Sequence, residues 1–517
     1  MDISTDNCTI GVVGAGTMGS GIALAALYKG YRVILQDSFP GALEKGRDYI
    51  EKFLAKKDLS ANAGLVTYAK ELAALAPANI VIEAIIEDLG VKQELFRQLD
   101  QICPPPAILA SNTSTLAVTA IASVVGQPGR VAGMHFFNPA PILPLVEVVR
   151  AGESAPETLA ALVALAEALE KTPVVTGDTP GFIVNRVARP YYGEALRLLG
   201  EGVASFEEID LLAEQGAGFR MGPFRLMDLI GIDINATAML SMYEQTHGEP
   251  RYRPHFLQMQ KMQAGTLGRK TGRGFYSYEN SEAAVDIPEL VATLQGAVLV
   301  SEGTWAPGLK DYMRKIGLEA DKVTPVGLAP RAVFVAAGRD ELLPEETNVY
   351  LAGTDKSLPV FVPAVDMTVA ELTTLTDEPE RIVGYDSLFF AGGTAVTLTA
   401  SPMLTDEHRA RADETVRALG KRPVWVKDSP GLVLPRIVFQ LVNEAAFAHL
   451  ENVGEADTID LAMRLGVNYP KGPLAWGREF GFSKVVAELD HLYNEYREDR
   501  YRACVLLRRW ARLEEVK

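Results

Sequence analysis

His135 is the residue of this sequence that is best suited to proton transfer near neutral pH. It lies in the stretch GMHFFNP (residues 133–139), between a strand-like apolar run and an Asn-Pro turn. Glu147 follows in the next apolar run. A carboxylate that accepts a hydrogen bond from one ring nitrogen leaves the other nitrogen free to take a proton. The pair predicts a general base; the alternative is a buried structural histidine.

Two further polar side chains favour the catalytic interpretation. Ser114 belongs to the hydroxyl-rich stretch 111–115, which follows a strand-like run and can offer hydrogen bonds to a reacting oxygen. A stretch of this kind can also serve only as a helix cap. Asn185 lies on the other side of His135 in the sequence, near the start of a helical region. We therefore expect these side chains to accompany His135 in one site.

The segment 8–37 has the order strand, glycine turn, helix, strand, acid. The turn is Gly14-Ala15-Gly16-Thr17-Met18-Gly19. In such a turn the first glycine permits the bend, the second lets the backbone approach a pyrophosphate, and the third lets the helix pack on the strand. Asp37 suits the ribose hydroxyls of NAD and would repel the 2′-phosphate of NADP. The segment predicts an NAD site.

Charged residues also follow the next strand-like run, residues 80–85. Glu87 and Lys92 would stand at the carboxyl edge of a parallel sheet, where doubly wound folds bind ligands. Lys56 and Lys57 belong to a charged helix over residues 41–57, and such charges most often form a solvated face.

Composition excludes several classes of function. The 517 residues carry a net charge of −16, which argues against nucleic acid or an anionic membrane surface as the main partner. Three distant cysteines (Cys8, Cys103, Cys504) make neither a disulfide framework nor a metal-ligand spacing, so no metal is expected. No signal peptide is recognised, and no run approaches the roughly 18 apolar residues of a membrane span. We expect a soluble, cytoplasmic protein with no membrane partner.

The chain repeats itself at an offset of 250 residues (428 − 178 = 250). Residues 178–186 (DTPGFIVNR) match residues 428–436 (DSPGLVLPR), and the offset persists to the Gly-Pro pairs at 222 and 472. In the first copy, Thr179 as N-cap and Pro180 as first helical residue predict a long helix with Gly200 beyond its end. The match extends backwards more weakly, from residues 130–134 to residues 381–385. The repeat is a domain-scale duplication.

The second copy lacks the residues that could perform chemistry. Three positions change: His135 to Asp386, Ser114 to Ala364 and Asn185 to Pro435. Residues 281–360 contain no glycine turn like that of residues 14–19 and are too few for a full dinucleotide-binding domain. We expect one catalytic half and one half that keeps the fold without the chemistry.

Six stretches, in this order and spacing, resemble an NAD-dependent L-3-hydroxyacyl-CoA dehydrogenase: GAGTMGSG, IEAIIEDLGVKQELF, SNTSTL, GMHFFNP, VEVV and DTPGFIVNR. The resemblance is specific across residues 8–278 and weaker across 330–510. The duplicated organisation is similar to the longer bacterial 3-hydroxybutyryl-CoA and 3-hydroxyadipyl-CoA dehydrogenases of phenylacetate degradation. It implies NAD-dependent oxidation of a (S)-3-hydroxyacyl-CoA to a 3-oxoacyl-CoA.

The resemblance also implies roles for individual residues. His135 would be the general base, Glu147 its partner acid, and Ser114 and Asn185 would hold the substrate oxygen. The implied cofactor contacts are Gly14, Ala15, Gly16, Thr17, Met18, Gly19, Asp37, Glu87, Lys92, Asn112 and Lys270. Contacts to the CoA phosphates would come from Lys56 and Lys57, in a stretch that aligns less closely.

The implied fold class is α/β plus all-α, in four parts. They are an NAD-binding Rossmann domain (1–177), a helical domain (178–283), a reduced, degenerate Rossmann-like domain (284–427) and a second helical copy (428–517). Short members of the family pair through their helical domains, so the second copy is expected to make a pseudo-dimer within the chain. A regulatory ligand site in the second half is the alternative, and a homo-oligomer is a further option.

Two other functions stay open from the sequence alone. The first is oxidation of a free hydroxy acid, such as L-gulonate, on the same fold. Relatives of that kind have a proline directly after the histidine, whereas Phe136 stands there in this chain. The second is a binding or structural protein that has lost its chemistry, which the set His135, Glu147, Ser114 and Asn185 argues against for the first half.

Overall fold

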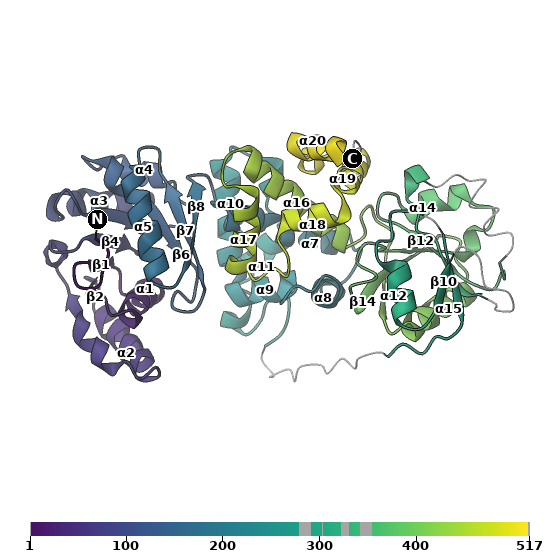
Figure 1. Ribbon diagram of the computed structural model, residues 1–517, viewed down its shortest axis with the longest axis horizontal. Helices are drawn as coiled ribbons and strands as arrows, with labels where there is room; N and C mark the ends of the chain where they lie inside the picture. The colour runs from purple at the N-terminus through teal and green to yellow at the C-terminus, as the bar shows by residue number, and fades with distance from the viewer. Residues whose placement is uncertain (1, 279–290, 302, 322–329, 342–353, 515–517) are drawn as a thin grey trace. The chain divides into compact units, whose positions relative to one another are not determined.

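The computed structural model describes residues 2–278, 291–301, 303–321, 330–341 and 354–514 (Figure 1). The chain forms two compact units. Unit 1 contains Met1–Val187 and Ala448–Asn468, and unit 2 contains Ala188–Phe447 and Tyr469–Lys517. The four domain limits expected from the sequence stay a prediction, and the limit at residue 283 lies outside the described residues. Within the part of the chain that is described, no helix is long and apolar enough to cross a membrane.

The described part of unit 1 is built on an eight-stranded sheet in the order β3-β2-β1-β4-β5-β6-β7-β8. All neighbouring strands are parallel except β6 and β7, which are antiparallel. The strands are β1 (Thr9–Val13), β2 (Arg32–Gln36), β3 (Val66–Ala69), β4 (Ile80–Glu83), β5 (Ile108–Ser111), β6 (Val131–Phe136), β7 (Leu145–Arg150) and β8 (Thr172–Gly177). Continuous apolar runs form most of the central strands because both faces of the sheet are covered.

Two apolar clusters cover the two faces of this sheet. One joins the strands to α1 (Thr17–Tyr28), α2 (Ala42–Ala55) and α5 (Pro156–Ala168). The other joins them to α3 (Leu89–Ile102) and α4 (Val118–Ala122). Helices on both faces of a mostly parallel sheet are the doubly wound arrangement. The Rossmann-type fold predicted for the first part of the chain is thus confirmed.

The helix that was predicted to start at Pro180 begins later. Its first turn is α6 (Val184–Val187), and α7 (Arg189–Gly200) follows and includes Gly200. Gly181 and Phe182 have φ angles of +77° and +50°, which a right-handed helix does not accept. The prediction was wrong here because the left-handed residues turn the chain before the helix can form. The second copy has the same turn, at Gly431 and Leu432 (φ +71° and +50°).

A segment from the second copy belongs to unit 1. It contains α17 (Ala456–Gly466). The Gly177 N–H donates to the carbonyl of Val453 (3.0 Å). A Cβ on Gly466 would lie 2.8 Å from a methyl group of Leu145 and 2.9 Å from one of Val184, so a larger residue would require these side chains to move. The segment packs beside the end of β8 and against α6.

The described part of unit 2 contains further helices of both copies and a second sheet. The helices are α7, α8 (Phe206–Leu211), α9 (Pro223–Ile230), α10 (Ile232–Gln245), α11 (Phe256–Gln263), α12 (Leu309–Lys315), α14 (Val369–Leu372), α15 (Asp406–Ala418), most of α16 (Leu434–Leu450), α18 (Pro473–Phe480), α19 (Phe482–Tyr496) and α20 (Val505–Glu514). The predicted helical region and its second copy are therefore present.

The described strands of unit 2 form a seven-stranded sheet in the order β10-β9-β11-β12-β13-β14-β15. They are β9 (Ala297–Val300), β10 (Glu319–Asp321), β11 (Pro330–Phe334), β12 (Val360–Pro363), β13 (Ile382–Tyr385), β14 (Ala395–Ala400) and β15 (Arg422–Val426). Only β13 and β14 are antiparallel, as β6 and β7 are in unit 1. The sheet is the reduced second Rossmann-like part that the sequence predicts.

The two sheets correct one detail of the repeat. Asp178 accepts the N–H groups of Val118 and Thr119, and Asp428 accepts those of Val369 and Ala370. The offset at this helix is therefore 251 (369 − 118). Ser114 then falls opposite Val365, and not opposite Ala364 as predicted, because the second copy is one residue shorter than the first between this helix and the aspartate (428 − 370 = 58, against 178 − 119 = 59).

Candidate active site

His135 and Glu147 face each other across the antiparallel strands β6 and β7. The register of the two strands pairs these residues directly. The Nδ1 atom of His135 lies 2.8 Å from Oε2 of Glu147. Glu147 is fully buried and His135 is 6% exposed. The neighbouring rings of Phe137 and Phe182 lie 4.6 Å and 5.9 Å from the imidazole, centre to centre. Both side chains thus have a fixed position.

The second carboxylate oxygen of Glu147 is also occupied. Its Oε1 accepts the N–H groups of Ile183 and Val184, each at 3.0 Å. These donors are the chain immediately before and at the start of α6, which the turn at Gly181 and Phe182 presents. A buried carboxylate needs such donors because an unpaired charge away from water is costly. Glu147 is therefore oriented by groups that sequence reasoning did not identify.

Ser114 and Asn185 lie near each other, as expected. Asn185, on α6, donates from Nδ2 to the carbonyl oxygen of Ser114 (3.3 Å). Asn112 accepts the N–H of Phe136 at 2.8 Å, which ties the end of β5 to the strand that carries His135. The structure thus places His135, Asn112, Ser114 and Asn185 in one unit, at the carboxyl ends of β5 and β6.

The glycine turn between β1 and α1 has the geometry that a pyrophosphate needs. A Cβ on Gly14 (φ +99°) would lie 2.7 Å from the Ala84 carbonyl, and one on Gly19 would lie 1.8 Å from the Gly14 carbonyl. A Cβ on Gly16 meets no described atom within 4 Å. Gly16 is also the N-cap of α1, whose first turn has no side-chain cap and no acid. The free N–H groups there suit phosphate oxygens.

Gly16→Ala tests this reading of the turn. The added methyl group meets no protein atom, so we expect an unchanged melting temperature. It enters the space that a pyrophosphate would fill, so we expect the Kd for NAD to rise about tenfold or more, equivalent to about 1.4 kcal/mol. Calorimetric titration with NAD measures the change. Gly64→Ala is the matched control, because its Cβ also meets nothing within 4 Å. An unchanged Kd for Gly16→Ala would contradict this role.

Asp37 shapes the same turn. Its Oδ2 accepts the N–H of Ala15 (2.7 Å) and its Oδ1 accepts the N–H of Phe39 (2.8 Å). The carboxylate therefore lies beside the glycine turn at the end of β2. Thr17 and Met18 open α1 directly after it. The contacts of these residues to the adenosine and pyrophosphate stay a prediction.

Lys92 belongs to a buried ionic network. It is 1% exposed, and its Nζ lies 2.5 Å from Glu83 Oε1 and 3.3 Å from Glu87 Oε2. The Ser111 hydroxyl donates to the other oxygen of Glu83 (2.6 Å). Glu83 and Ser111 were not anticipated from the sequence; the available signal was a glutamate that ends an apolar strand. Since removing one partner of a buried pair leaves an uncompensated charge, the network fixes the carboxyl ends of β4 and β5.

Glu87 holds the loop that carries Ser114. Its Oε1 accepts the Thr113 hydroxyl (2.7 Å) and the N–H groups of Ser114 (2.9 Å) and Thr115 (3.1 Å). Burial acts to raise the pKa of Glu87, but the charge of Lys92 and these hydrogen bonds outweigh it, and the pKa lies below its ordinary value. The ionised carboxylate is thus the form that orders this loop.

Three predicted lysines have different surroundings. Lys56 and Lys57 follow α2 and are exposed, and their Nζ atoms lie over the rings of Phe53 (4.9 Å) and Tyr28 (4.4 Å). Lys270 lies in unit 2, where its Nζ pairs with Asp233 at 2.6 Å. Their contacts to CoA and to NAD stay predictions.

Comparison with known proteins places the chain in a family. A profile described as "3-hydroxyacyl-CoA dehydrogenase, NAD binding domain" matches residues 9–179. A second, "3-hydroxyacyl-CoA dehydrogenase, C-terminal domain", matches residues 181–278 and again 431–517. The first match confirms NAD as the cofactor, and the glycine turn fits it. The double match confirms the duplication of the helical part.

Individual relatives agree with these matches. The chain is 37% identical to the 3-hydroxyadipyl-CoA dehydrogenase of Escherichia coli (strain K12), over 98% of each chain. A crystal structure of 3-hydroxybutyryl-CoA dehydrogenase from Escherichia coli superposes with a TM-score of 0.83 at 35% identity, over 98% of this chain and 99% of that one. A probable 3-hydroxybutyryl-CoA dehydrogenase of Bacillus subtilis (strain 168) is 44% identical over 52% of this chain and 96% of its own. The chain therefore belongs to the NAD-dependent 3-hydroxyacyl-CoA dehydrogenase family.

Proposed function

We propose that the protein oxidises (S)-3-hydroxyacyl-CoA thioesters to 3-oxoacyl-CoA, with His135 as the general base. The observation that carries this proposal is the buried pair of His135 and Glu147, with 2.8 Å between Nδ1 and Oε2. We propose that Ser114 and Asn185 hold the substrate oxygens beside this base. The NAD contacts we propose are Gly14, Ala15, Gly16, Thr17, Met18, Gly19, Asp37, Glu87, Lys92, Asn112 and Lys270.

The geometry gives each side chain of the site a task. A bound NAD would supply the acceptor for the hydride that leaves C3 of the substrate. Glu147 accepts the Nδ1–H of His135, which leaves Nε2 as the atom that takes the hydroxyl proton. The imidazolium that results is stabilised by the same carboxylate. Asn185 and Ser114 hold the substrate oxygen in line, which contributes through alignment.

The relatives suggest the acyl group. The two relatives from Escherichia coli are named as dehydrogenases of 3-hydroxyadipyl-CoA and of 3-hydroxybutyryl-CoA. We propose short and dicarboxylic 3-hydroxyacyl-CoA thioesters as the substrate class. A dicarboxylic acyl chain ends in a carboxylate, which an arginine can bind through two parallel hydrogen bonds. The sequence offers Arg186, Arg189, Arg220 and Arg225 for this role, with a surface or structural role as the alternative for each of them. Arg186 is buried and pairs with Glu451 (2.8 Å).

A substrate panel tests the proposal. NADH formation is followed with (S)- and (R)-3-hydroxybutyryl-CoA, (S)-3-hydroxyadipyl-CoA, and the free acids 3-hydroxybutyrate and L-gulonate. We expect activity with the (S) thioesters only, and comparison of kcat/KM among them selects the acyl chain. Activity on a free acid without activity on any thioester would overturn the proposal.

For the second half we propose a pseudo-dimer within the chain, supported by reciprocal contacts in unit 2. The Tyr501 hydroxyl of the second copy donates to Glu194 of the first copy (3.0 Å). The Tyr252 hydroxyl of the first copy donates to Glu444 of the second copy (2.5 Å). Glu194 and Glu444 are equivalent at the offset of 250, and both tyrosines stand in the sequence Arg-Tyr-Arg.

Reciprocal exchange of equivalent contacts is what a two-fold interface produces. Here the two copies are covalently joined, so the surface that a short enzyme would give to a second subunit is covered by the same chain. We also propose four domains, at 1–177, 178–283, 284–427 and 428–517.

All three cysteines are buried and unpaired, which suits a reducing compartment and supports a cytoplasmic location.

Asp386 tests whether the second sheet is a scaffold. It replaces His135, is 1% exposed, and accepts the N–H groups of Leu388 and Phe389 through Oδ1 (3.1 and 3.2 Å). Burial raises its pKa to about 7, although these bonds oppose the shift. A carboxyl group with a raised folded-state pKa stabilises the fold at low pH, and this contribution is lost as pH rises towards 7.

Asp386→Asn removes the titration and keeps an oxygen for both N–H groups. We expect the melting temperature of this variant, relative to that of the wild type, to increase with pH. The difference between the two should be larger at about pH 8 than at about pH 5. Differential scanning fluorimetry at both pH values measures this. We expect kcat to stay unchanged; a loss of kcat would contradict the scaffold role.

A further inference from the structure

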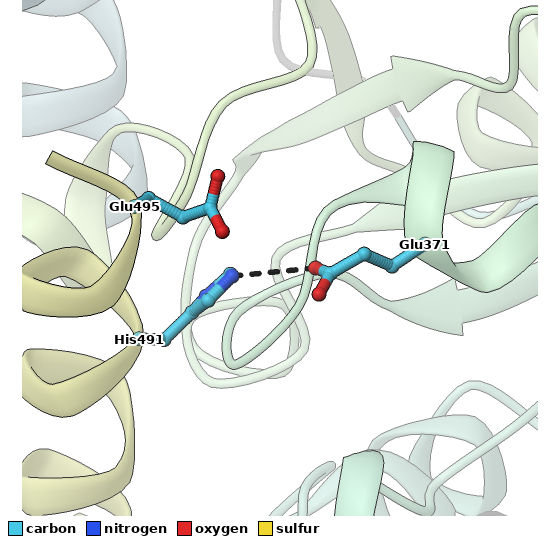
Figure 2. Close-up of side chains that lie close together, drawn as sticks. All are labelled: Glu371, His491 and Glu495. Carbon is cyan, nitrogen blue, oxygen red and sulfur yellow. Dashed lines mark ion pairs between the residues drawn. The ribbon is translucent and has the colours of Figure 1, made fainter.

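Helix α19 presents three titratable side chains towards α14 in unit 2. Glu488, His491 and Glu495 are spaced three and four residues apart, which places them on one face of the helix. Glu371 of α14 faces them, and its Oε2 lies 3.3 Å from Nε2 of His491. Figure 2 shows His491 and the carboxylates of Glu371 and Glu495 turned towards a common space. Their ligand atoms all lie within 4.8 Å of one another.

The buried members of this cluster are not satisfied by hydrogen bonds. His491 is 5% exposed, and neither ring nitrogen makes a hydrogen bond to any residue that the structure describes. Glu488 is fully buried, and neither of its carboxylate oxygens makes a hydrogen bond to a residue in the described part of the chain. Buried polar groups without partners are costly, and in a native protein they call for a partner such as an ion. The imidazole of His491 is therefore a buried polar group that faces two carboxylates without a hydrogen bond to either of them.

Three carboxylates lie around the imidazole of His491. Arg339 lies 3.5 Å from Oε1 of Glu371, on the oxygen that faces away from His491. Glu371 Oε2 also accepts the N–H of Thr368 (2.8 Å), which fixes its position as the partner in a capping box. Glu371 is thus anchored while it faces His491.

We propose that Glu371, Nε2 of His491 and Glu495 bind one divalent transition-metal ion of the Zn²⁺ class. One imidazole with two carboxylates suits such ions, whereas Ca²⁺ and Mg²⁺ prefer all-oxygen sets. Three protein ligands leave a fourth position for water. Ligand atoms on a tetrahedral Zn²⁺ lie about 3.4 Å apart, so binding draws the three groups together. Glu495 is exposed and free to make this movement.

Glu488 has a separate task at this site. Its Oε2 lies 3.8 Å from Nδ1 of His491, the nitrogen that does not face the ion. A histidine that binds a metal commonly donates its other N–H to a carboxylate, which fixes the ring and its tautomer. Glu488 is a positioning residue of this kind. The ion would join α14, which follows β12 of the sheet, to α19 of the helical part of unit 2.

The cluster is specific to the second copy. At the offsets of 251 for α14 and 250 for α19, the equivalent residues of the first copy cannot form it. They are Ala120 for Glu371, Ala238 for Glu488, Ser241 for His491 and Gln245 for Glu495. All four positions thus gain a charged or metal-binding side chain in the half that lost the proposed catalytic residues. The second half therefore carries a cluster of titratable side chains that the first half lacks.

Calorimetric titration with ZnCl₂ tests the proposal, with the full chain treated with EDTA and purified without a polyhistidine tag. We expect a single site whose occupation raises the melting temperature. His491→Ala should abolish this binding, and Glu488→Gln should weaken it about 10- to 100-fold. His449→Ala is the matched control: His449 Nδ1 lies 4.0 Å from Glu455, and the pair has no place in the cluster.

NADH formation at the wild-type rate shows that each variant is folded, since none of these residues belongs to the proposed catalytic site. Two results would overturn the proposal. One is wild-type protein that binds Zn²⁺ no more tightly than about millimolar. The other is a folded His491→Ala variant that binds Zn²⁺ as tightly as the wild type.

Discussion

His135→Ala is expected to lower kcat by about 10²- to 10⁴-fold, which is the usual contribution of a positioned base. The loss should fall on kcat because the imidazole acts on the hydroxyl proton as the hydride leaves. The Kd for NAD should change little, since the glycine turn and Asp37 do not contact His135. Steady-state NADH formation and calorimetric titration with NAD together measure this split.

His408→Ala is the matched control for this variant. His408 is also largely buried, and its ring nitrogens contact the Thr405 hydroxyl (2.8 Å) and the Lys356 carbonyl (2.9 Å) of unit 2. It should keep the wild-type kcat. A His135→Ala protein that loses NAD binding but keeps its turnover at saturating NAD would contradict the assignment of His135.

Glu147→Gln is expected to lower kcat by as much as about 10⁴-fold, the effect of the corresponding acid-to-amide change in a Ser-His-Asp triad. The amide keeps an oxygen for the N–H groups of Ile183 and Val184. Its NH₂ group would then face Nδ1 of His135 and favour the tautomer with the proton on Nε2. That tautomer cannot accept the substrate proton.

The same variant should remain folded, because both N–H groups keep their acceptor. The melting temperature and the Kd for NAD check this, and kcat from NADH formation gives the effect. Glu147→Gln with the kcat of the wild type would show that the carboxylate does not set the tautomer of His135.

Local patterns of the sequence account for the units that position the site. The glycine turn predicts β1, α1 and the acid at residue 37, because each glycine has a distinct steric task. The apolar runs around His135 and Glu147 predict two neighbouring strands. The duplication predicts the second helical part and the altered position 386. In all of these, the information lies within a few residues or in the comparison of the chain with itself.

Contacts between distant residues could not be predicted in this way. The donors to Glu147 Oε1 come from residues 183 and 184, and only the fold reveals that the turn at Gly181 and Phe182 delivers them. Because of the same left-handed turn, the helix that Pro180 was predicted to start begins only at Val184. The burial of Lys92 between Glu83 and Glu87 also depends on which strands become neighbours. The periodicity of apolar residues predicts which face of a helix or strand is buried. It does not predict which polar groups from distant parts of the chain come into contact.

Chemical rescue of His135→Ala tests most directly whether this imidazole takes the proton. NADH formation in a single turnover is followed at saturating NAD with (S)-3-hydroxybutyryl-CoA, with and without free imidazole. We predict a slow reaction that free imidazole accelerates in proportion to its concentration, while the wild type does not respond. A variant that turns over at the wild-type rate without imidazole would contradict His135 as the base.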